Sequence, residues 1–204
     1  MAWDKEQMFE ADWWGDCTNT LGEQLKHLTY SRLMGMPIVN EGGKYAIHQE
    51  GRDILDIGGG PCSMLLYTRA NKRTVVDPCP YPDWTKARYE AAGIELVRAP
   101  AEEFESKHVY DEAWCYNVLQ HTQDPQQVID VMLNSACMIR MFEWVDIPPH
   151  PGHPHELKSR KLVEWGGFNE RGAWWAESMI GWDYWHGGEY RDLPAFHGYT
   201  AEVK

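Results

Sequence analysis

The chain has 204 residues, of which 43% are hydrophobic and 25% are charged, a composition that is ordinary for a globular protein and excludes collagen-like, low-complexity and disordered classes. Its formal net charge is −12 at pH 7, from 19 basic and 31 acidic residues. The basic residues are not grouped, which disfavours a nucleic acid as partner. No stretch approaches the roughly 18 uninterrupted apolar residues of a membrane helix, and Met1 to Glu6 show no secretory signal. We therefore expect a cytoplasmic protein with no membrane partner.

The cysteines are five in number, widely spaced and without a Cys-x-x-Cys pair. This pattern argues against a disulfide framework and against a zinc knuckle, and it is typical of reduced thiols.

The first predicted element is a helix over residues 19–34. Leu21, Leu25 and Leu28 fall close to one face, and Gly35 with Pro37 ends the helical pattern. The next signal is Gly42-Gly43, which indicates a loop.

After this loop, short apolar runs alternate with helical segments. Strands are predicted at 54–57, 74–76, 94–97, 112–116 and 138–144, and helices at 63–70, 83–92, 125–133 and 155–165. Such alternation is typical of βαβ units with a parallel sheet between helices. We expect an α/β fold, a Rossmann-like, doubly wound, mainly parallel sheet of about seven strands with helices on both faces and an N-terminal helical lid.

The organisation expected from this pattern is a single domain over residues 1–204. It divides into a helical cap (1–50), a cofactor-binding core (51–145), and a substrate rim with C-terminal strands (146–204). Ligands of parallel sheets bind at the carboxyl ends of the strands. The chemistry should therefore lie in the loops after residues 57, 76, 97, 116 and 144.

The loop Asp56-Ile57-Gly58-Gly59-Gly60-Pro61 follows the first of these strands, where glycines let a ligand approach the backbone. A structural turn explains the motif equally well by itself. Asp77, about 20 residues on, ends the second strand, where a carboxylate can accept both hydroxyls of a ribose. Ser63 stands where a dinucleotide fingerprint has its third glycine. These residues therefore favour a cofactor that contains a nucleoside. A nicotinamide-dependent oxidoreductase is the third of three hypotheses for the function.

Four segments in order, residues 54–60, 75–77, 101–103 and 110–125, resemble the successive motifs of class I S-adenosylmethionine-dependent methyltransferases. The last segment is especially similar to the small-molecule, quinone-biosynthesis-like type. The resemblance implies S-adenosyl-L-methionine as cofactor. It implies that Asp56, Gly58, Gly59 and Gly60 surround its methionine part, Asp77 and Pro78 hold the ribose, Ala101 and Glu102 border the adenine, and Asn117 and Val118 lie beside the methionine tail.

His121, just beyond the fourth strand, is the best-placed candidate for a catalytic base. Packing or capping of the following helix is an equally weighted role for this side chain. The proline-rich segment 146–155 contains His150, His153 and His155. We interpret it as a substrate rim, with His153 and His155 in contact with substrate, in preference to a metal site.

Eleven tryptophans against five phenylalanines is an unusual ratio, and most of the tryptophans lie near the two ends of the chain. Trp13 and Trp14 could stack on substrate or on the cofactor's sulfonium. Packing of terminal elements onto the sheet is the favoured alternative.

The function predicted is methyl transfer from S-adenosylmethionine to a small molecule, at oxygen or carbon. The alternative is a protein that binds S-adenosylmethionine or S-adenosylhomocysteine without transferring a methyl group.

Overall fold

The computed structural model describes residues 2–18, 20–146, 148–149, 153–167 and 174–178. Its helices are α1 (Ala2–Trp14), α2 (Thr20–Leu33), α3 (Asp83–Ala91), α4 (Pro125–Ser135) and α5 (Ser159–Gly166). Its strands are β1 (Ile38–Glu41), β2 (Lys44–His48), β3 (Ile54–Ile57), β4 (Thr68–Arg69), β5 (Arg73–Val76), β6 (Glu95–Val97), β7 (Tyr110–Tyr116), β8 (Ala136–Trp144) and β9 (Trp174–Ser178).

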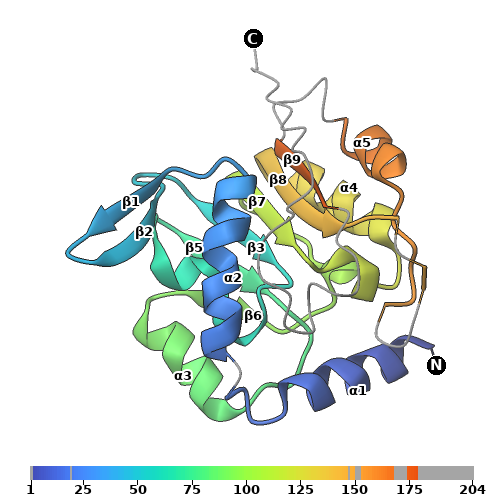
Figure 1. Cartoon of the computed structure of the whole chain (residues 1–204), viewed down its shortest axis with the longest axis horizontal. Coiled ribbons are helices and arrows are strands. Elements are labelled where there is room, and N and C mark those ends of the chain that lie inside the picture. Colours follow the sequence, from blue (N-terminus) through green and yellow to red (C-terminus); the bar gives the residue numbers. More distant parts are fainter. Residues whose placement is uncertain (1, 19, 147, 150–152, 168–173, 179–204) are drawn as a thin grey trace.

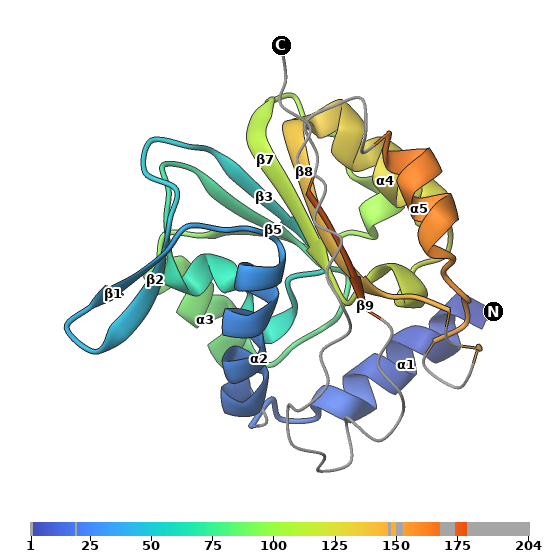
Figure 2. The same cartoon turned by 45° about the horizontal axis from the view of Figure 1, so that its top comes forward.

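The central sheet contains six of these strands in the order β6-β5-β3-β7-β8-β9, and every neighbouring pair is parallel. Helices α2 and α3 lie on one side of it and α4 and α5 on the other, as Figures 1 and 2 show. The Rossmann-like, mainly parallel fold predicted from the sequence is confirmed. The prediction of about seven strands includes C-terminal strands within residues 146–204, and residues 179–204 lie outside the described part of the chain.

Alternating side chains along each strand build two separate cores, because successive residues of a strand point to opposite faces. Leu55 and Cys115 pack with α4 and α5, whereas Ile54 and Trp114 pack with α2 and α3. Both faces are therefore buried, which explains why the strands read as nearly continuous apolar runs.

A small second sheet, β1-β2-β4, was not predicted. Its hairpin turns at Gly42 and Gly43, whose φ angles are +60° and +82°. Two successive residues with positive φ make the tight turn that matches the twist of paired strands. The glycine pair that indicated a loop is thus a β-hairpin turn.

Two predicted helices differ from the structure. Residues 63–70 form a 3₁₀ turn (Met64–Tyr67) followed by β4, because the backbone N–H of Met64 donates to the hydroxyl of Tyr116 and that of Leu65 to the Ser63 hydroxyl. The last predicted helix begins at Ser159 instead of His155. The imidazole of His155 is held at 2.8 Å from the backbone carbonyl of Thr122.

None of the helices in the described residues combines the length and the apolar character that a membrane crossing requires. All five cysteines are free thiols, and only Cys137 is exposed.

Candidate active site

A cavity of about 870 Å³ opens at the carboxyl ends of the parallel strands, and α1 lies across it. This volume is within the usual range for a bound cofactor or drug-sized ligand. The cavity brings together most of the residues expected from the sequence: Trp13, Trp14, Gly58, Gly59, Gly60, Asp77, Pro78, Ala101, Glu102, Asn117, Val118, His121 and His153. Asp56 and His155 are not among the residues that line it.

Close packing explains why glycines occupy the loop after β3. A Cβ at Gly58 would lie 2.4 Å from Cγ1 of Val118, and one at Gly59 would lie 2.8 Å from a carboxylate oxygen of Asp56. A Cβ at Gly60 would meet Trp14 at 3.6 Å, which is ordinary contact. Gly58 thus lets the loops after β3 and β7 approach each other, and Gly59 lets the loop fold closely over Asp56 and Ser63. Of the three glycines, Gly60 is the one with space for a side chain.

Asp56 lies behind the loop and is fully buried. One of its oxygens accepts hydrogen bonds from the hydroxyl of Tyr116, at 2.6 Å, and from the hydroxyl of Ser63. Burial raises the pKa of Asp56 to about 7, against these two hydrogen bonds, which lower it. The carboxyl group positions the ring of Tyr116, which lines the cavity.

Asp77 directly follows β5, and its carboxylate is already oriented. One oxygen accepts from the backbone N–H of Gly60 and the other from that of Cys79, both at 2.9 Å. Burial raises the pKa of Asp77 to about 6, and the two backbone hydrogen bonds oppose that rise. The hydroxyl of Tyr81 is a third hydrogen-bond partner of the Asp77 side chain, so about one of the four lone pairs of the carboxylate is left to accept from a ligand hydroxyl.

The turn after β7 is held by Glu143, a fully buried residue of β8. Asn117 has a φ of +59°. The backbone N–H of Val118 then donates to both Glu143 oxygens, at 3.0 and 3.1 Å, and that of Leu119 donates at 3.3 Å. Burial raises the pKa of Glu143 to about 8. Sequence reasoning missed this residue, although an acidic side chain inside a buried apolar strand was the available signal.

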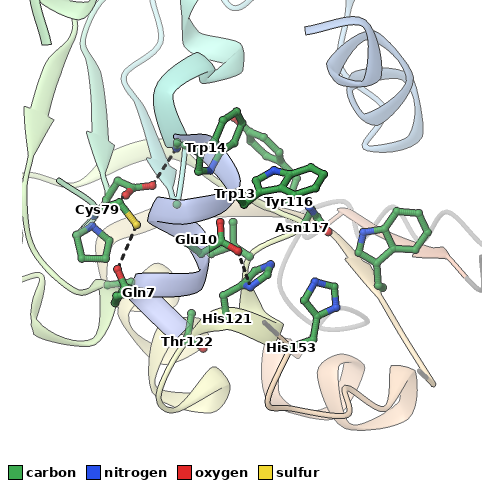
Figure 3. Close-up of a pocket in the computed structure, with 18 of the residues that line it drawn as sticks. Gln7, Glu10, Trp13, Trp14, Cys79, Tyr116, Asn117, His121, Thr122 and His153 are labelled. Atoms are coloured by element: carbon green, nitrogen blue, oxygen red, sulfur yellow. Dashed lines mark hydrogen bonds and ion pairs between the residues drawn. The ribbon is translucent and has the colours of Figure 1, made fainter. Parts of the chain in front are cut away.

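His121 lies between Glu10 of α1 and His153, as Figure 3 shows. Its Nδ1 is 3.1 Å from Oε1 of Glu10, and its ring stands perpendicular to that of His153 with 4.5 Å between centroids. Helix α1 therefore supplies a carboxylate to the histidine that follows β7. Within the described residues, no group of histidine, cysteine and carboxylate side chains is arranged to hold a metal ion.

Helix α2 contributes four lining residues that no motif predicted, Glu23, Lys26, His27 and Tyr30. Lys26 forms an ion pair with Glu23. Burial lowers the pKa of Lys26, and the Glu23 carboxylate partly opposes this. Burial lowers the pKa of His27 to about 3, so this imidazole is neutral near pH 7.

Residues 55–134 match the model of a family described as a methyltransferase domain. The sheet order and the glycine loop agree with this match, so residues 55–134 are similar to a methyltransferase domain, and S-adenosylmethionine is the cofactor that this similarity indicates. No protein of curated function matches the chain in sequence.

Solved structures share the fold at low sequence identity. A complex between the Haloferax volcanii Trm112 methyltransferase activator and a methyltransferase contains a chain with 14% identity and a TM-score of 0.55, over 91% of this chain and 84% of that one. Phosphoethanolamine N-methyltransferase 1 of Haemonchus contortus, solved with phosphoethanolamine and S-adenosylhomocysteine, has 15% identity and a TM-score of 0.56, over 87% of this chain and 41% of that one. The YcgJ protein of Bacillus subtilis has 14% identity and a TM-score of 0.52, over 67% and 70%.

The chain spans only 51% and 60% of the length of two further matched structures. At these identities the similarity concerns the fold, and the acceptor has to be argued from the cavity itself.

Proposed function

We propose that the chain transfers the methyl group of S-adenosylmethionine to an oxygen or carbon atom of a small molecule. The observation that carries this proposal is the convergence of the glycine loop, the Asp77 carboxylate and His121 on one cavity at the strand ends. Fold alone does not define chemistry. These three features follow β3, β5 and β7, which are neighbours in the sheet, and together they supply a nucleoside grip and a proton acceptor.

The residues present fit the cofactor. Asp77 has acceptor capacity for a ribose hydroxyl, because two amides and the Tyr81 hydroxyl account for three of the four lone pairs of its carboxylate. Lys26 is the one lysine or arginine among the described lining residues. It lies beside Cys62, just past the glycine loop, and we assign it to the methionine carboxylate. Ala101 and Glu102 line the part of the cavity assigned to the adenine.

When bound, the cofactor supplies an electrophilic methyl group and a thioether leaving group. The residues of the chain hold the methyl donor and the methyl acceptor in line and exclude water from the cavity. We assign to Nε2 of His121 the removal of the acceptor's proton. Because Nδ1 is 3.1 Å from the Glu10 carboxylate, the carboxylate fixes the ring orientation and stabilises the imidazolium that forms.

Helix α1 is the proposed lid. It reaches the loop after β3 through Trp14, the loop after β5 through Gln7, and the turn after β7 through Glu10. Closure would then exclude water and complete the acid–base pair in one movement.

The test combines two measurements on the whole chain. Calorimetry should show binding of S-adenosylhomocysteine, and incubation with methyl-labelled S-adenosylmethionine and a metabolite extract should give a labelled product together with S-adenosylhomocysteine. Binding without any transfer would favour the alternative of a cofactor-binding protein, and no binding would overturn the assignment of the site.

A further inference from the structure

Aromatic side chains from α1, α2, β7 and β8 line the cavity. Tyr30 of α2 and Tyr116 of β7 are tilted rings 6.3 Å apart. Trp144 at the end of β8 and Trp13 and Trp14 of α1 complete this wall. Tyr116 and Trp144 are 5% and 3% exposed, so their surfaces are fixed by packing. Rigid aromatic walls bind planar ligands by stacking and attract cations through their ring faces.

The charge of the cavity is strongly one-sided. Its described lining residues include five carboxylates (Glu10, Glu23, Asp77, Glu102 and Asp146) and the single cation Lys26. Lys26 is already paired with Glu23, and Asp146 is paired with Lys158, which is not among the described lining residues. A negative group on an acceptor would therefore enter a partly buried site of like charge, where screening by solvent is weak.

Glu10 places one of these carboxylates beside the reacting centre. Its side chain is 18% exposed and lies 3.1 Å from His121. An anionic group next to His121 would meet the Glu10 charge directly, whereas a neutral hydroxyl or an ammonium group would not be repelled. Selection against a wrong ligand by like charge is an established route to specificity.

We infer that the methyl acceptor is a planar aromatic compound whose substituents are uncharged or cationic, and that the cavity rejects carboxylate- and phosphate-bearing analogues. This inference rests on the proposed function, since it names the substrate class of the same site.

The test uses three ligands that share a catechol ring and differ in charge: catechol, 3,4-dihydroxybenzoate and dopamine. Binding to the whole chain, first saturated with S-adenosylhomocysteine, is measured by calorimetry. We expect catechol and dopamine to bind, with dopamine at least as tight, and dihydroxybenzoate to bind at least tenfold more weakly than catechol. Equal or tighter binding of dihydroxybenzoate overturns the inference, and so does the absence of binding by all three ligands to the loaded protein. Failure of S-adenosylhomocysteine itself to bind overturns the proposed function instead.

A pair of variants tests the assigned source of the discrimination. Glu10→Gln removes the carboxylate beside His121 and should narrow the affinity ratio between catechol and dihydroxybenzoate at least threefold. Asp12→Asn removes the same charge from an exposed position of α1 outside the cavity and should leave that ratio unchanged. Equal effects of the two variants would show that net charge, and not the cavity, discriminates, and would overturn the role given to Glu10. Circular dichroism of both variants checks that α1 remains folded.

Discussion

Asp77 shows how a single side chain is prepared for a ligand by the backbone around it. Two amides hold its carboxylate at the end of β5, so little ordering is left to be done when a ribose binds. The same two bonds mean that removal of the whole side chain would also disturb the glycine loop. A conservative change is therefore the sharper test.

We expect Asp77→Asn to weaken S-adenosylhomocysteine binding at least tenfold, since it removes a charged acceptor from hydrogen bonds that are each worth about 1.5 to 3 kcal/mol. Calorimetry measures the affinity. Asp130→Asn, on the exposed side of α4, is the control and should bind as the wild type does. Unchanged affinity in the Asp77 variant would remove this residue from the cofactor site.

Gly58 and Gly51 form a matched pair for the glycine loop. Both have positive φ, +68° and +77°, so alanine at either position costs about 1 to 2 kcal/mol of stability. Only at Gly58 does the new Cβ collide with a neighbour, Val118, whereas Gly51 has open space. Gly58→Ala should therefore lower the free energy of unfolding by about 1 to 3 kcal/mol more than Gly51→Ala. Denaturant titration compares the two, and equal losses would contradict the packing explanation.

His121 separates catalysis from binding at the residue scale. We expect His121→Ala to lower kcat about 10² to 10⁴-fold with the acceptor found in the transfer assay, and to leave the affinity for S-adenosylhomocysteine within about twofold of the wild type. His48→Ala, an exposed histidine of β2, is the control. Equal losses of kcat and of affinity for S-adenosylhomocysteine would show that His121 has a structural role. Undiminished kcat would mean that positioning alone suffices for the acceptor.

At the scale of elements, α1 differs from the helices that flank the sheet. Among the side chains of α1 that the structure describes, Trp14 is the one that packs against a buried cluster, formed by Cys17, Cys79 and Tyr81. Met8, Phe9 and Trp13 are exposed. The helix therefore contributes little to the two cores of the sheet, and its contacts concentrate on the loops around the cavity.

Deletion of residues 2–14 should accordingly leave a cooperative thermal transition while abolishing methyl transfer, because the deletion removes Glu10 and opens the cavity to water. Circular dichroism follows the transition, and the labelled-cofactor assay follows turnover. Full turnover by the shortened chain would refute the lid. Loss of the cooperative transition would show that α1 is part of the folding unit.

At the scale of the whole molecule, three carboxyl groups are buried under the loops of the cavity, Asp56, Asp77 and Glu143, and burial raises the pKa of each. A carboxyl group whose pKa is higher in the folded state binds more protons folded than unfolded between the two pKa values. Stability from such a group is therefore greatest below its unfolded pKa near 4 and declines as pH rises towards its folded pKa. His27 acts in the opposite direction, because its folded pKa is lowered to about 3 and the unfolded chain takes up its proton first.

A variant isolates one of these opposing contributions. Asp56→Asn mimics the protonated carboxyl group, so the variant does not lose this contribution as pH rises. The free energy of unfolding of the variant minus that of the wild type should therefore increase between pH 4 and about 7 and be constant above that. The slope is at most about 1.4 kcal/mol per pH unit. Urea titrations of both proteins at several pH values measure the difference. A difference that does not change with pH would contradict the raised pKa of Asp56.

Sequence determined the class of this fold because short apolar runs alternating with helical segments can bury both faces only as a parallel sheet between helices. The sequence also placed Gly58, Asp77 and Asn117 together at one edge of the sheet, because residues that directly follow parallel strands meet there. It did not determine residues 63–70, where hydrogen bonds to Tyr116 and Ser63 replaced the expected helix by a 3₁₀ turn.

Only the tertiary structure decided which further side chains reach the cavity. Glu10 and Lys26 come from helices without a motif, and Glu143 comes from a strand whose pattern predicts only burial. Glu10 pairs with His121, and Glu143 with the amides of Val118 and Leu119. These partners are distant from them in sequence. Local sequence fixes periodicity and chain direction, but contacts between segments that are far apart depend on how the helices pack onto the sheet.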